Sequence, residues 1–149
     1  MPAPTTLIVL AVVPDGDRYL VVEERDGALY LPAGRVDRGE NLMAAIVRET
    51  AEEAGVLIGL TGILGFDQDW APDGSATRLR FVFVGYQGIA GPPKTTPDRH
   101  SRGAAWLTKA ELAARRLRDP EVLTWIERHE SHATLLPCAS YRPRGGGAS

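Results

Sequence analysis

The stretch GRVDRGENLMAAIVRETAEEAGV, residues 34–56, carries the strongest information on how this chain folds. Within it, Asn41–Ala54 predicts a helix, because Asn41 can cap the first turn and Gly55 can end the helix in the left-handed conformation. At about 100° per residue, the apolar residues fall on one broad face. That face comprises Leu42, Met43, Ile46, Val47, Ala51 and Ala54. We therefore expect one side of the helix to pack on a core.

Three carboxylates crowd the C-terminal end of this helix. Glu49, Glu52 and Glu53 fall within an arc of about 100°, and Arg48 lies one turn before Glu52, where the two can pair. The carboxylates repel one another, and the helix dipole at this end favours cations. A divalent cation would turn that cost into a gain, and the hard ion Mg²⁺ prefers oxygen ligands. The cluster predicts a metal site, although neighbouring glutamates on a helix are also typical of a solvated face.

The loop before the helix carries a glycine that fits the same site. LPAG, residues 31–34, ends a predicted strand and turns back over the helix. Gly34 would let the backbone approach a ligand closely, and its carbonyl could serve as a further oxygen ligand. A lone glycine before a helix is usually only a turn residue. The functional interpretation therefore depends on Gly34 and the glutamates occurring together.

The spacing of these residues resembles the signature of the Nudix hydrolase family, G-x5-E-x7-R-E-U-x-E-E-x-G-U, where U is aliphatic. The matching residues are Gly34, Glu40, Arg48, Glu49, Glu52, Glu53, Gly55 and Val56. Two residues depart from the pattern: Thr50 carries a hydroxyl at an aliphatic position, and Ala33 stands where many members have a second glycine. The match is specific for the family and says little about the substrate.

The resemblance implies an α/β fold: an α/β/α sandwich around a mixed central sheet, with the signature as a loop-helix-loop catalytic box. It also implies hydrolysis of a nucleoside diphosphate linked to another group, with Mg²⁺ or Mn²⁺ as the cofactor. Carried over by position, Arg48 would orient the carboxylates and Glu40 would steady the loop. The implied catalytic residues are Arg48, Glu49, Glu52 and Glu53, and the implied metal ligands are Gly34, Glu49, Glu52 and Glu53.

The identity of the general base stays open. Glu52 is either a metal ligand or the base that activates water. Many members of the family supply a further carboxylate from the loop before the last strand, and here that loop reads PDRHS, residues 97–101. His100 stands about where a glutamate would be expected, and Asp98 is a candidate substitute. A histidine at such a position is also typical of an ordinary surface residue.

Outside the catalytic box, short apolar and β-branched runs predict strands separated by turns, with a hairpin at Pro14–Asp17. The predicted strands are Leu7–Val13, Tyr19–Glu24, Ala28–Leu31, Val56–Phe66, Leu79–Tyr86 and Ala104–Leu107, with a polar loop over Asp67–Thr77. Two more helices should begin at the capping box Thr108–Glu111 and at Asp119–Glu121. A mixed sheet with packed helices follows. We expect one domain over residues 1–130 and a partly disordered tail over residues 131–149.

Several residues are candidates for binding the substrate. Arg35 and Arg80 could hold phosphate, and Tyr30 and Trp70 could stack on a base, although aromatic residues on strands are usually part of the core. The small size and the loop before the helix resemble family members that remove oxidised or non-standard nucleoside di- or triphosphates. Two alternatives are a pyrophosphatase acting on ADP-ribose or another nucleotide sugar, and a regulatory module that binds nucleotides without catalysis. A structural protein with an accidental box is a third.

Composition limits the partners. Lys and Arg total 17 and Asp and Glu total 19, a net charge of −2, which favours neither a nucleic-acid polymer nor a membrane surface as partner. The apolar run Leu7–Val13 is too short for a membrane span, which needs about 20 residues. The single cysteine, Cys138, fits a reducing compartment, so we expect a cytoplasmic protein. The family resemblance implies a small nucleotide as its partner. The resemblance leaves a homodimer open.

Overall fold

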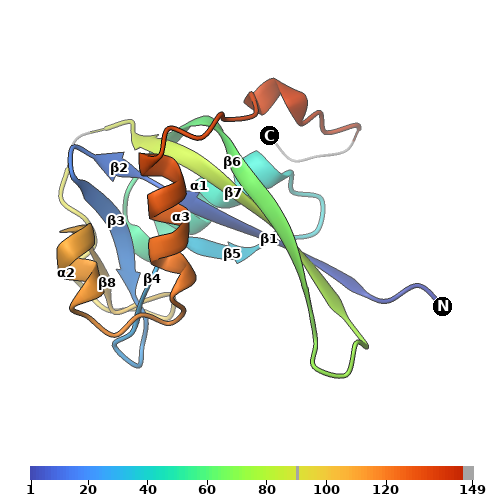
Figure 1. The fold of residues 1–149 in the computed structure, drawn as a ribbon, viewed down its shortest axis with the longest axis horizontal. Coiled ribbons are helices and arrows are strands. Elements are labelled where there is room, and N and C mark those ends of the chain that lie inside the picture. Colours follow the sequence, from blue (N-terminus) through green and yellow to red (C-terminus); the bar gives the residue numbers. More distant parts are fainter. Residues whose placement is uncertain (90, 146–149) are drawn as a thin grey trace.

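Strand β1 (Thr5–Val12) runs through the centre of the computed structural model, which describes residues 1–89 and 91–145 (Figure 1). It pairs in parallel with β7 (Thr77–Gln87) and antiparallel with the short strand β5 (Ala33–Arg35). β7 in turn pairs antiparallel with β6 (Ile58–Trp70), so the order of this sheet is β5-β1-β7-β6. The parallel pair makes the sheet mixed, which confirms the predicted class.

A second four-stranded sheet is built around β3 (Arg18–Glu23). β3 pairs antiparallel with β8 (Gly103–Thr108) along its whole length, and also with β4 (Leu29–Tyr30) and β2 (Pro14–Asp15). The hairpin predicted at Pro14–Asp17 is present, because Pro14 and Asp15 of β2 pair with Tyr19 and Arg18 of β3. β1 itself belongs to the first sheet, where it pairs with β5 and β7. β1 is apolar on both faces, and such a strand needs a central position between two others.

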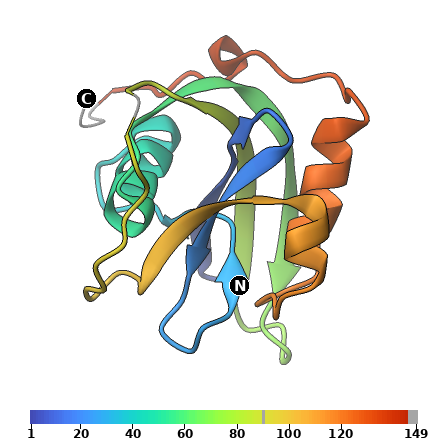
Figure 2. The ribbon, with the colours of Figure 1, turned by 90° about the vertical axis from the view of Figure 1, so that its left-hand side faces the viewer.

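Helices cover both sides of the strands (Figure 2). α1 (Leu42–Ala54) lies on one side, and α2 (Lys109–Ala113) and α3 (Glu121–Glu130) lie on the other, with a short 3₁₀ turn, η1 (Cys138–Ser140), near the end of the chain. Val9 and Ala11 of β1 pack in the cluster that contains α1, whereas Leu10 and Val12 pack in the cluster that contains α3. The chain is therefore an α/β/α sandwich.

The boundaries of α1 match the prediction, but its buried face is rotated. The Asn41 side chain accepts a hydrogen bond from the Ala44 N–H at 2.8 Å, and Gly55 ends the helix at φ 68°. Ala51, predicted to be part of the apolar face, is exposed, and Thr50 is buried in its place. The Thr50 hydroxyl donates to the Ile46 carbonyl at 2.7 Å, so burial leaves no polar atom unsatisfied.

The hairpin of β6 and β7 is longer than predicted. The polar loop expected over Asp67–Thr77 is wrong for its first part, because β6 continues to Trp70. Asp67 and Asp69 each face an arginine of β7 across the ladder, and such cross-strand charge pairs stabilise strands that look like loop in the sequence. The pairing register of β6 with β7 shifts between Leu60 and Gly62 and between Ile63 and Gly65, so these glycines lie at bulges.

Residues 131–145 also contact the sandwich. Leu136 pairs with Ile63 of β6, and the Tyr141 hydroxyl accepts a hydrogen bond from the Leu42 N–H at 3.1 Å. The last four residues of the predicted tail, 146–149, lie outside the described residues. Within the described ranges, no helix is both long and apolar enough to cross a membrane.

Candidate active site

Arg48 is the centre of a charged network on the outer face of α1. Its guanidinium donates to both oxygens of Glu40 at 2.7 and 2.9 Å, and through Nη1 to Glu49 Oε1 at 2.9 Å and Glu52 Oε2 at 3.1 Å. A further bond from Nη2 reaches the Arg35 carbonyl at 3.0 Å. Arg48 therefore ties two carboxylates of the acidic cluster to the loop before the helix.

Glu40 steadies that loop. Besides Arg48, its Oε1 accepts the Asp37 N–H at 3.0 Å, and the hydrogen bonds from Arg48 hold the pKa of Glu40 below its usual range. The loop is partly a strand: Gly34, expected in a turn, belongs to β5 and pairs with Val9. The pairing of β5 with β1 therefore holds this loop in position next to α1.

Gly34 is required by its neighbour on α1. A Cβ built at this position would lie 2.1 Å from Cδ of Glu49 and within 2.5 Å of both carboxylate oxygens. Any side chain at position 34 would displace this carboxylate. The close approach of Glu49 thus explains why position 34 is a glycine. The sequence alone did not reveal this contact.

Glu53 is the most buried carboxylate of the acidic cluster. Its Oε1 accepts the Ala33 N–H at 2.9 Å, and no hydrogen bond from the described residues reaches its second oxygen. The pKa of Glu53 is raised to about 8, mainly by burial; the Ala33 N–H opposes this rise, and the negative charges of Glu49 and Glu24 add to it. Burial likewise raises the pKa of Glu49. Both side chains are costly to ionise here, and a nearby cation would reduce that cost.

The donor chemistry of the cluster fits a hard divalent cation. Glu49, Glu52 and Glu53 offer carboxylate oxygens, with Glu49 against Gly34 and Glu53 bonded to the Ala33 N–H, and Mg²⁺ and Mn²⁺ favour all-oxygen surroundings. In the conformation described for residues 1–89 and 91–145, no group of three or more His, Cys, Asp or Glu side chains converges closely enough to hold an ion. Arg48 draws Glu49 and Glu52 toward itself.

The loop between β7 and β8 holds the C-terminal end of α1. Lys94 Nζ donates to the Glu52 carbonyl at 3.1 Å, and the buried Ser101 hydroxyl donates to the Glu53 carbonyl at 2.6 Å. Positive charge at a helix C-terminus is stabilising. Neither residue was singled out from the sequence, because no local pattern links a loop residue to a helix end more than 40 positions away.

Asp98 and His100, the two candidates from this loop, have different surroundings. The Asp98 carboxylate is paired with Lys94 and accepts the N–H groups of His100 and Ser101, and these contacts lower its pKa to about 2. A carboxylate held that low is a weak base. His100 Nδ1 lies 3.7 Å from Oε2 of Glu52, so His100 sits beside the acidic cluster.

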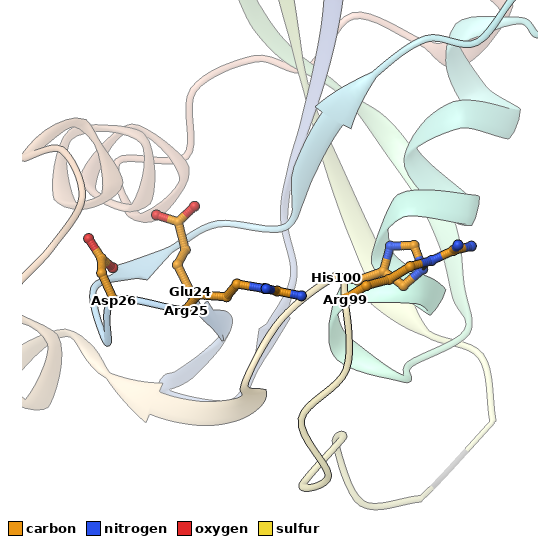
Figure 3. A pocket seen from close by; sticks show the side chains of 5 residues that line it. All are labelled: Glu24, Arg25, Asp26, Arg99 and His100. Carbon is orange, nitrogen blue, oxygen red and sulfur yellow. Dashed lines mark hydrogen bonds between the residues drawn. The ribbon is translucent and has the colours of Figure 1, made fainter.

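A pocket of about 350 Å³ lies beside the C-terminal end of α1 (Figure 3). One wall is the turn after β3 and the other is the loop before β8. The lining residues are Glu24, Arg25, Asp26, Arg99 and His100. Arg25 extends toward the wall that carries Arg99 and His100. This opening, which the sequence did not predict, gives access to the Glu52 side of the cluster.

A second pocket, of about 230 Å³, lies on the other side of the cluster, next to Gly34. We call it the arginine pocket, and its lining residues are Ile8, Tyr30, Ala33, Gly34, Arg35, Arg78, Arg80 and Arg118. Three of the four predicted substrate residues, Tyr30, Arg35 and Arg80, come together here. Trp70 does not line this pocket; it lines a separate hollow with Pro72 at the tip of the β6–β7 hairpin. Arg118 was missed in the sequence.

Comparison with known proteins identifies relatives of this arrangement. A family model described as the NUDIX domain matches residues 2–126. The 8-oxo-dGDP phosphatase NUDT18 of Mus musculus is 32% identical, over 87% of this chain and 42% of the mouse protein. A putative nudix hydrolase 1 of Caenorhabditis elegans is 33% identical, over 89% of this chain and 36% of its own length. This chain thus spans less than half the length of these curated relatives.

A solved structure matches nearly the whole fold. It is a NUDIX hydrolase from Nitrosomonas europaea, with 29% sequence identity and a TM-score of 0.82. The match covers 96% of this chain and 99% of that one. A match over 96% of the chain is longer than the family model's residues 2–126, so it also includes part of the chain outside that range.

Proposed function

The chain belongs to the Nudix hydrolase family, and from this we propose that it hydrolyses a diphosphate bond in a nucleoside di- or triphosphate, with Mg²⁺ or Mn²⁺ as cofactor. The observation that carries the proposal is the acidic cluster Glu49, Glu52 and Glu53, tied by Arg48 to the loop at Gly34, with a pocket on either side. An extended anionic substrate could lie across the cluster with its ends in the two pockets.

The residues of the acidic cluster would have different roles in the reaction. Glu49, Glu53 and the Gly34 carbonyl would hold the metal ion. When bound, the ion would neutralise the diphosphate and make its water ligand more acidic. Glu52 would accept the proton of the attacking water at Oε1, because Arg48 already occupies Oε2. A positioned carboxylate base typically contributes about 10²- to 10⁴-fold in rate.

Arg48 would keep this geometry in place throughout the reaction. Its contacts to Glu40 fix the guanidinium, and the fixed guanidinium in turn limits where Glu49 and Glu52 can move. Pre-set ligands avoid reorganisation when charge develops on the phosphate. The buried position of Glu53 raises the affinity of its carboxylate for a cation, since an ion restores the interactions that burial removed.

We propose oxidised guanine nucleotides as the first substrates to test. The support is the name of the mouse relative, an 8-oxo-dGDP phosphatase, together with the arginine pocket, which suits a phosphorylated ligand. ADP-ribose and other nucleotide sugars are the alternative substrates. In either case the proposed partner is a small nucleotide, and we propose a cytoplasmic location. Light scattering would show whether the protein forms a homodimer.

The decisive experiment is a substrate panel with and without Mg²⁺. Release of phosphate or pyrophosphate is measured for 8-oxo-dGDP, 8-oxo-dGTP, the unmodified nucleotides, ADP-ribose and a UDP-sugar. Glu53→Gln should lower the rate by at least about 10²-fold. Glu127→Gln, the same change on the exposed face of α3, should leave it unchanged. No turnover of any compound, or full activity in Glu53→Gln, would overturn the proposal.

A further inference from the structure

Four arginines line the arginine pocket, and two of them are already neutralised. The Arg80 guanidinium donates to both oxygens of Asp67 and both oxygens of Glu121 at 2.7 to 2.8 Å, and its side chain is only 13% exposed. Arg78 makes a two-bonded contact with Asp69. If either arginine turned toward a ligand, its carboxylate partners would lose their hydrogen bonds. These two arginines therefore build the wall of the pocket.

Arg118 is held much more loosely. Its guanidinium lies over the ring of Tyr30, with Cζ 4.7 Å from the ring centroid. Among the described residues, its one ion pair joins Nη1 to Glu24 Oε2 at 3.1 Å, and the side chain is 53% exposed. A single exposed ion pair of this kind is weak and exchanges readily. The charge of Arg118 is thus available to a stronger partner.

The backbone at Arg118 is nevertheless held in place by hydrogen bonds. Its N–H donates to the Leu29 carbonyl at 2.9 Å, and the Leu29 N–H donates to the Arg116 carbonyl at 3.0 Å, so the backbone runs as a short parallel bridge beside β4. The Tyr30 hydroxyl donates to the Glu121 carboxylate, which holds the ring beneath the guanidinium. The main chain and the stacking surface are rigid, and only the contact to Glu24 is free to change.

The Arg118–Glu24 pair lies between the two pockets. Arg118 lines the arginine pocket and Glu24 lines the pocket of Figure 3. A substrate that crosses the cluster from one pocket to the other must therefore pass this ion pair.

We propose that Arg118 binds a phosphate group of the substrate, and that Glu24 is the carboxylate from which Arg118 is released to do so. The inference rests on the proposed function, since it assigns a phosphate contact of the same site. A phosphate offers two oxygens to the planar guanidinium fork, whereas Glu24 takes only one bond. Glu24 and the phosphate compete for the guanidinium of Arg118. Removing Arg118 should therefore weaken binding of the substrate, whereas removing the charge of Glu24 should strengthen it.

The test measures binding of two probes by calorimetry in the presence of Mg²⁺: the non-hydrolysable α,β-methylene analogue of dGDP and inorganic pyrophosphate. Arg118→Ala should weaken binding of the analogue by about 10- to 100-fold, as expected for loss of charged hydrogen bonds. Arg118→Lys should recover part of that loss. Glu24→Gln should tighten binding several-fold. Arg116→Ala is the matched control, because Arg116 lies in the same loop, is 61% exposed and lines neither pocket.

The outcomes separate this inference from the proposed function. Equal affinity in Arg118→Ala and Arg116→Ala, with turnover by the wild type, overturns the phosphate contact and leaves the hydrolase in place. Loss of pyrophosphate binding in Arg118→Ala, with no turnover of any panel compound by the wild type, supports the contact and overturns the hydrolase. Weaker binding in Glu24→Gln would overturn the exchange of partners. Failure of the wild type to bind either probe would overturn the contact.

Discussion

Replacing Gly34 by alanine should strongly lower the activity of the protein without unfolding it. The new Cβ would lie 2.1 Å from Cδ of Glu49, whereas non-bonded carbon atoms approach to about 3.5 Å, so the carboxylate must move by about 1.4 Å. Gly34 is not among the residues with positive φ, so alanine fits the backbone. The side chain of Glu49, whose carboxylate is its flexible end, gives way rather than the pairing of β5 with β1.

The two consequences differ in size. Loss of the Arg48–Glu49 contact costs stability of about 0–1 kcal/mol, as for other partly exposed ion pairs. Displacement of a catalytic group by about 1 Å can cost about 10²-fold in rate. We therefore expect kcat/KM on the best panel substrate to fall about 10²-fold, while the midpoint of urea unfolding changes little.

Gly59→Ala is a matched control for this prediction. Its Cβ would lie 2.3 Å from Cζ of Tyr86, an exposed ring outside the site that can also move aside. This variant should keep its activity. If Gly34→Ala retained activity within about threefold, the position of Glu49 would not matter to the reaction; if it unfolded, the backbone would have yielded in place of the side chain. Either result refutes the reasoning.

Three further predictions concern other residues of the same helix and loop. Arg48→Lys should lower kcat/KM about 10- to 100-fold in steady-state kinetics, because the three donors of one ammonium cannot replace the five hydrogen bonds that the planar guanidinium makes; unchanged kinetics would show that charge alone suffices. Thr50→Val should change the free energy of unfolding in urea by less than about 1 kcal/mol, because Ile46 keeps its helical partner; a larger loss would mean that the hydroxyl has another role. The pKa of Asp98 is lowered from 3.8 to about 2, so its contribution to stability is present above pH 4 and is lost as the pH falls toward 2. The difference in Tm between wild type and Asp98→Asn should shrink over that range, and a constant difference would contradict the assignment.

The features that were predictable from the sequence are those with local signals. Asn41 and Gly55 mark both ends of α1 within four residues of the turns they cap, and Thr108 with Glu111 marks the start of α2. The acidic cluster was recognised because helical periodicity alone brings Glu49, Glu52 and Glu53 to one side. Each of these inferences needs only neighbours within two turns of helix.

The features that were missed depend on residues far apart in the chain. The parallel pairing of β1 with β7 joins segments 72 residues apart, as Thr5 faces Thr77, and no local pattern encodes it. Arg118 reaches Glu24 across 94 positions, and Ser101 reaches Glu53 across 48. Trp70 was grouped with the substrate residues by its aromatic character, yet the extended hairpin carries it away from the arginine pocket. Such contacts follow from the fold and have no signature of their own.

The central position of β1 has a consequence for how the protein unfolds. Because alternate side chains of this strand belong to opposite hydrophobic clusters, neither layer can melt while the other stays intact. We therefore expect α1 on one side and α3 on the other to unfold as a single cooperative unit, with the amides of β1 among the last to exchange with solvent. Local opening of the surface around the acidic cluster should then be confined to the loops, since the scaffold beneath it opens only as a whole.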